Sequence, residues 1–82
     1  MTTHDVRASV EYRAGDTWHF GHTIGREVSD LPDAAEWLQS EADRFLQAAA
    51  PEVTGLRIVA RLDGITSSDE RPIETLSLEA RR

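Results

Sequence analysis

The sequence of 82 residues contains no cysteine, no lysine and no apolar run of the roughly 18 residues that a membrane-spanning helix needs. The absence of cysteine excludes disulfide bonds, thiolate zinc sites and a cysteine nucleophile, and it is typical of a reducing compartment. The first residues, "MTTHDVRASV", lack the basic start and apolar stretch of a signal peptide. We therefore expect a cytoplasmic protein that does not bind membranes.

Arginine supplies all nine basic residues. It binds carboxylates and phosphates bidentately, although codon bias in a GC-rich genome produces the same composition. The net charge of −6 opposes phosphate binding, so nucleic acid is not the expected main partner. The chain also lacks a P-loop, a dinucleotide-binding glycine run, a nucleophile elbow, a zinc-protease motif and an EF-hand loop. These absences predict a protein that is not an enzyme and holds no cofactor or metal.

Four segments alternate apolar and polar residues, which is the pattern of a strand with one buried face. They are residues 6–13, 18–25, 56–62 and 75–81. In each segment the apolar side chains mostly occupy the even-numbered positions, so we expect the even side to face the core. The turn sequence "AGDT" joins the first two segments into a hairpin.

One helix is predicted between "SDLPDAAEW" and Pro51. Ser29 or Asp30 caps its first amides, and Pro32 is tolerated in its first turn. Its apolar stripe is formed by Leu31, Ala35, Leu38, Ala42, Phe45 or Leu46, and Ala49.

The element order predicts an α+β fold of ββαββ type, with a four-stranded sheet and one helix packed on one face. It covers a single domain, 1–82, with a flexible N-terminus at 1–4 and a polar loop at 63–72. The order and length resemble the β-grasp or ubiquitin-like arrangement, which implies parallel first and last strands in the sheet centre. A plain antiparallel meander plus helix is the alternative. A ubiquitin-like conjugated modifier would need a terminal Gly-Gly in place of "EARR", so conjugation is not expected.

The segment "WHFGHTIG" places two histidines three residues apart. On a regular strand His19 and His22 point to opposite faces, so they form no metal pair unless a bulge at Gly21 brings them together. On the outward face the segment is bare, because Gly21 and Gly25 flank Thr23. This surface fits a partner chain or self-association into a homodimer; alternatively, the glycines relieve strain in a twisted strand.

A second candidate surface lies on the helix, where Trp37, Glu41 and Arg44 share a flank beside the apolar stripe. Tryptophan and arginine are enriched at binding hot spots, which favours a protein interface. The alternative is that Trp37 covers the edge of a small core. The segment from Asp30 to Glu52 holds six acidic residues and one arginine, so the helix side is acidic.

These observations predict a small acidic protein-binding module that acts as an adaptor, inhibitor or assembly component. The alternative is binding of nucleic acid or an anionic ligand on the open sheet face by Arg57 and Arg61 with His19. An enzymatic function would require a pocket joining a histidine to a carboxylate such as Asp16 or Glu27.

Overall fold

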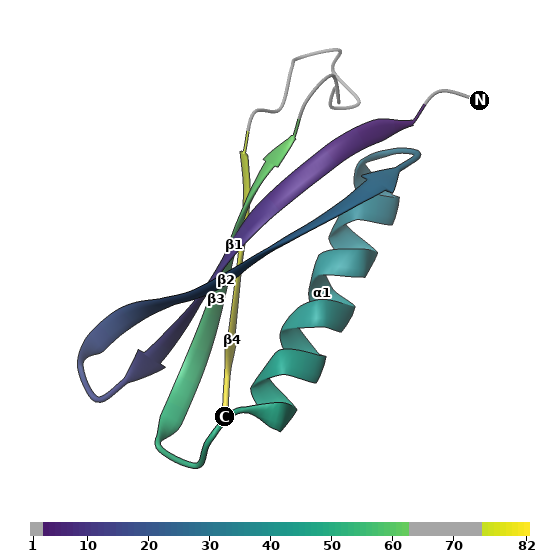
Figure 1. Ribbon diagram of the computed structural model, residues 1–82. Coiled ribbons are helices and arrows are strands. Elements are labelled where there is room, and N and C mark those ends of the chain that lie inside the picture. The colour runs from purple at the N-terminus through teal and green to yellow at the C-terminus, as the bar shows by residue number, and fades with distance from the viewer. Residues whose placement is uncertain (1–2, 63–74) are drawn as a thin grey trace.

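The computed structural model describes residues 3–62 and 75–82 (Figure 1). Its elements in chain order are β1 (His4–Ala14), β2 (Thr17–Val28), α1 (Leu31–Ala48), β3 (Val53–Leu62) and β4 (Thr75–Arg81). This order confirms the ββαββ prediction. Strand β1 already includes His4, which pairs with Val28. The predicted polar loop, 63–72, lies outside the described residues.

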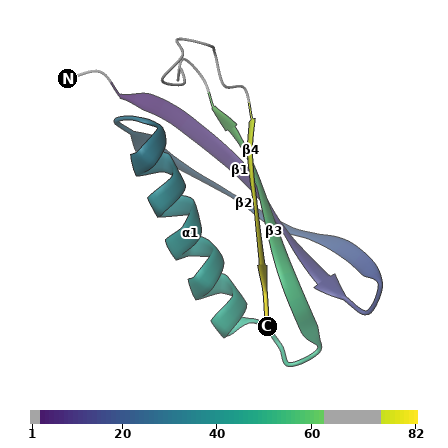
Figure 2. The same ribbon diagram turned by 180° about the vertical axis from the view of Figure 1, so that it is seen from behind.

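The strands form one sheet in the order β2-β1-β3-β4, and every pair is antiparallel. The β-grasp resemblance is not confirmed, because β4 lies at an edge of the sheet and β1 pairs with β2 and β3. The antiparallel alternative describes the sheet better, although β1 lies between β2 and β3 and the order is not a sequential meander. Helix α1 lies along one face, and among the described residues no other element covers the sheet (Figures 1 and 2).

The core lies between the sheet and α1, and most of it comes from alternate strand positions. Its fully or nearly buried side chains are Val6, Ala8, Val10, Val28, Ala34, Leu38, Ala42, Leu46, Leu56, Ile58, Ala60 and Leu62. The even-numbered side of β1 and β3 is therefore buried as predicted. On the helix, Ala34 is buried and Ala35 is exposed, so the predicted stripe is wrong at its first turn.

Both ends of α1 are closed by side chains. Asp30 caps the N-terminus, since its carboxylate accepts a hydrogen bond of 2.8 Å from the Asp33 amide. At the C-terminus, the Arg82 guanidinium donates to four carbonyl oxygens, at 2.7 Å to Leu46 and Ala49, 2.8 Å to Ala50 and 3.1 Å to Val53. Arg82 thus binds carbonyls of the last helical turn and of the segment that follows it, and it fastens the end of β4 to the end of α1. No described helix combines the length and apolar character that a membrane crossing requires.

Candidate functional site

We call the face of the sheet opposite α1 the open face. Its side chains lie in rows that cross the strands, because residues paired between antiparallel strands project to the same side. Each row is read here from β2 to β4. The first row is Trp18, Arg13, Gly55 and Arg81, and the second is Phe20, Glu11, Arg57 and Glu79. The third is Thr23, Ser9, Val59 and Ser77, the fourth is Gly25, Arg7, Arg61 and Thr75, and Glu27 and Asp5 begin a fifth.

A β-bulge at Gly21 determines which side chains of β2 reach this face. Val10 pairs with His22 and the next residue, Glu11, pairs with Phe20, so Gly21 is left over on β2. The alternation along β2 is therefore reversed between the turn and the bulge. The prediction that Trp18 and Phe20 face the core is wrong, because both lie on the open face.

The bulge is possible because Gly21 has no side chain. A Cβ atom at Gly21 would lie 2.7 Å from Cδ2 of Tyr12 and 3.1 Å from the carbonyl oxygen of Val10, too close for either contact. The Tyr12 ring, which faces α1, thus covers the Gly21 backbone. Gly21 does not belong to the outward surface as predicted, whereas Thr23 and Gly25 lie there as expected.

Trp18 is held on the open face by a cluster of three side chains. The Arg57 guanidinium carbon lies 4.4 Å from the centre of the Trp18 ring, which is a cation–π contact. The same guanidinium donates to both carboxylate oxygens of Glu11, at 2.9 Å and 3.3 Å. The hydrogen bond to Glu11 raises the pKa of Arg57 above its ordinary value, since it stabilises the charged guanidinium. These contacts fix the orientation of the indole ring.

Phe20 lies two residues after Trp18 on the edge strand, and its side chain is 67% exposed. No other large hydrophobic residue among the described residues is exposed. An isolated apolar side chain on a surface needs no explanation. Phe20, however, adjoins a fixed indole on a sheet face that no described element covers. The pair therefore forms a small apolar patch at one corner of the open face.

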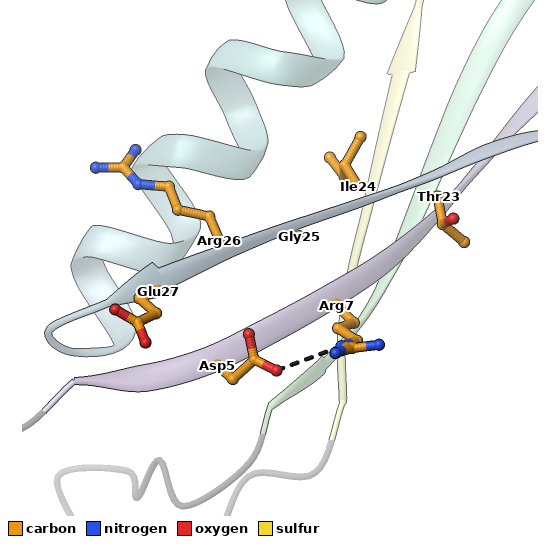
Figure 3. A pocket seen from close by; sticks show the side chains of 7 residues that line it. All are labelled: Asp5, Arg7, Thr23, Ile24, Gly25, Arg26 and Glu27. Carbon is orange, nitrogen blue, oxygen red and sulfur yellow. Dashed lines mark hydrogen bonds and ion pairs between the residues drawn. The ribbon is translucent and has the colours of Figure 1, made fainter.

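A hollow of about 460 Å³ lies on the β1–β2 part of the sheet around Gly25. It is lined by Asp5, Arg7, Thr23, Ile24, Gly25, Arg26 and Glu27. Figure 3 shows that Ile24 and Arg26 project from the α1 side of β2, while Glu27 and the paired side chains of Asp5 and Arg7 lie on the other side of β2.

The charges of the open face are nearly balanced. It carries five arginines (Arg7, Arg13, Arg57, Arg61 and Arg81) and four acidic residues (Asp5, Glu11, Glu27 and Glu79). Two neighbouring pairs along a strand, Arg7 with Asp5 and Arg81 with Glu79, lie at 3.3 Å. Arg61 is exposed, and it forms no ion pair with another residue that the structure describes.

The residues predicted on the helix flank form a separate surface. Trp37 is half-buried and packs against the core, as in the interpretation that it covers the core edge. Glu41 and Arg44 form an ion pair, and the Arg44 guanidinium carbon lies 4.9 Å from the Phe45 ring. The structure therefore does not bring these residues together with the open face.

The two histidines lie on the helix-facing side of the sheet, since His19 pairs with Tyr12 and His22 pairs with Val10. The prediction of opposite faces is wrong, because the bulge falls between them. His22 packs edge-on against Phe45 at 4.6 Å, and His19 is exposed. Within residues 3–62 and 75–82, no group of three or more histidine, aspartate or glutamate side chains is placed to hold a metal ion. His19 thus lies on the other side of the sheet from Arg57 and Arg61, which share the open face.

Comparison with known proteins finds no matching family model, no matching curated protein and no matching solved structure.

Proposed function

We propose that the chain is a non-catalytic, cytoplasmic protein-binding module whose partner docks on the open face. The observation that carries this proposal is the pair of Phe20, 67% exposed, and Trp18, held in place by Arg57. Tryptophan and arginine are the residues most enriched at binding hot spots, and a side chain that is fixed before binding loses little entropy when the partner arrives. The nearly balanced charges around the pair suit the polar rim of a protein interface.

The experiment is affinity capture from a lysate of the native host with the wild-type chain and the Phe20→Ser variant, followed by quantitative mass spectrometry. We expect Phe20→Ser to reduce capture of the specific partners at least about tenfold, as substitution of a hot-spot residue does. The matched control is Gln47→Ala on the exposed side of α1, which should capture the same proteins as the wild type. Equal capture by Phe20→Ser and the wild type would contradict the proposal.

A second candidate is single-stranded nucleic acid, and it is favoured by one observation. Exposed aromatic rings beside arginines on a sheet face are typical of surfaces on which bases stack. The charges oppose it, because Arg57 lies between Glu11 and Glu79 in its row. A fluorescent oligonucleotide distinguishes the candidates: binding that falls steeply with added salt and is lost in an Arg57→Ala, Arg61→Ala double variant would favour nucleic acid.

A further inference from the structure

The charges along β1 are arranged with an internal symmetry. On the open face β1 presents, in order, Asp5, Arg7, Ser9, Glu11 and Arg13. The signs are negative, positive, neutral, negative and positive. Reading the strand backwards from Ser9 inverts every sign. A two-fold axis that passes Ser9 and crosses the strands at right angles therefore places each of these β1 charges opposite the contrary charge on β1 of a second copy.

On β2, a large and a small residue lie on opposite sides of the same axis. Thr23 pairs with Ser9, so the axis also passes Thr23. The open-face residues on either side of Thr23 are Phe20 and Gly25. The same two-fold thus places the exposed Phe20 ring of each copy over Gly25 of the other. A side chain at Gly25 would make only ordinary van der Waals contacts, at 3.5 Å with the Val6 carbonyl oxygen and 3.9 Å with Cγ of Arg7, so the hollow around Gly25 has room for an added group.

Strand β3 contributes the centre and one unfavourable contact. Val59 pairs with Ser9 and meets its own copy across the axis, which gives the contact a small apolar centre. Arg57 comes opposite Arg61 of the second copy, a like-charged pair. Arg57 is already bonded to Glu11 at 2.9 Å, and the exposed Arg61 side chain can turn into solvent, so this contact costs less than two unpaired charges would.

We propose that the occupant of the open face is a second copy of this chain, in a symmetric dimer of two sheets packed face to face about the Ser9–Thr23 row. The proposal rests on the proposed function and names its partner. Sheets pack about 10 Å apart with their strands within about 30° of alignment, a geometry that preserves the pairings near the axis. Because the axis relates identical surfaces, every contact away from the axis is made twice.

The size of the face sets the strength to expect. Four strands about 4.8 Å apart and ten residues of about 3.3 Å each give a face of roughly 600 Å² per copy. Standard interfaces bury about 800 Å² per partner, so this contact lies at the small end of the range. We therefore expect a reversible dimer with a dissociation constant on the order of micromolar.

The test exchanges charges between the two ends of β1. Asp5→Arg gives a chain with arginine at both positions 5 and 13, and Arg13→Asp gives a chain with aspartate at both. Each variant repels its own copy, and each complements the other. Asp5 and Arg13 are chosen because their ion pairs within the chain are with exposed neighbours, at 3.3 Å and 3.8 Å, so the fold should tolerate both changes. Circular dichroism and thermal melting verify that both variants are folded.

Sedimentation equilibrium measures the dimer constant of the wild type, of each variant and of an equimolar mixture. The proposal predicts a wild-type dimer, dimerisation weakened roughly tenfold or more in each variant alone, and recovery in the mixture to near the wild-type constant. A steric arm supplies an independent readout: Gly25→Val fills the hollow and should also weaken the dimer, whereas Gln47→Ala on α1 should not. A wild-type monomer at all concentrations, or variants that dimerise as well as the wild type, would overturn the proposal.

Failure of the dimer and failure of the proposed function give different results. A monomeric wild type that captures lysate proteins in a Phe20-dependent manner would exclude the second copy as occupant and leave the open face as a binding surface. A dimer that persists in all the open-face variants, together with capture independent of Phe20, would contradict both.

Discussion

The Tyr12 ring lies on the backbone of Gly21, and this contact fixes the bulge that turns Trp18 and Phe20 to the open face. Gly21 and Gly25 therefore allow a comparison of the same substitution at two positions of β2. A methyl group at Gly21 would meet the Tyr12 ring and the Val10 carbonyl, whereas a methyl group at Gly25 meets nothing closer than 3.5 Å. The two glycines of β2 thus differ in what they tolerate.

We predict that Gly21→Ala lowers the free energy of unfolding by about 1 to 3 kcal/mol, the usual cost of overpacking. Gly25→Ala should change it by less than about 1 kcal/mol, and in the stabilising direction, because alanine restricts the unfolded chain. Urea denaturation of both variants checks the prediction. Equal effects at the two positions would show that the Tyr12 contact does not constrain Gly21.

The titration of Tyr12 reports on the burial of its side chain. Burial raises the pKa of Tyr12 above its usual value of about 10, because the charged phenolate is poorly solvated there. The neutral, buried Tyr12 side chain therefore contributes to stability below pH 10, and this contribution is lost as the pH rises through the raised pKa. Tyr12 is the single tyrosine of the chain, so absorbance near 295 nm follows it alone. We expect a midpoint above that of the urea-unfolded chain; coincident midpoints would contradict the prediction.

Substitution of Arg82 is expected to lower the free energy of unfolding more than substitution of its neighbour Arg81. Arg82→Ala removes the donor to the carbonyls of Leu46, Ala49, Ala50 and Val53, and we predict a loss of about 1 to 2 kcal/mol. Arg81→Ala breaks only the exposed ion pair with Glu79 and should cost less than about 0.5 kcal/mol. Thermal unfolding of the two variants measures the difference. The same melting temperature for both would show that Arg82 does not hold the helix end.

Substitutions of Trp37 on the helix flank and of Phe20 on the open face are expected to change stability by different amounts. Because Trp37 packs against the core, Trp37→Ala should lower the free energy of unfolding by about 1 to 3 kcal/mol. Phe20→Ser removes an exposed ring and should leave stability within about 0.5 kcal/mol of the wild type. Chemical denaturation measures both. If the Trp37→Ala variant were as stable as the wild type, Trp37 would not contribute to the core and would be a surface residue.

The sequence predicted the elements and half of the candidate site. Thr23, Gly25, Arg57 and Arg61 lie on the open face as the alternation indicated. Strict alternation through Gly21 predicts Trp18 and Phe20 in the core, whereas the bulge places both on the open face. The one signal of the reversal is the glycine in the middle of an alternating segment, because a glycine inside a strand often marks a bulge.

The amino-acid sequence by itself determined the ββαββ order, an N-terminal cap at Ser29 or Asp30 and the buried side of β1 and β3, because these depend on residues a few positions apart. The tertiary structure decided the antiparallel order β2-β1-β3-β4, the bulge at Gly21 and the closure of α1 by Arg82. Each of these depends on contacts between segments distant in the sequence. Strand neighbours are chosen by how the whole apolar surface is buried, and the bulge is fixed by a ring on the adjacent strand. Local periodicity carries no record of either.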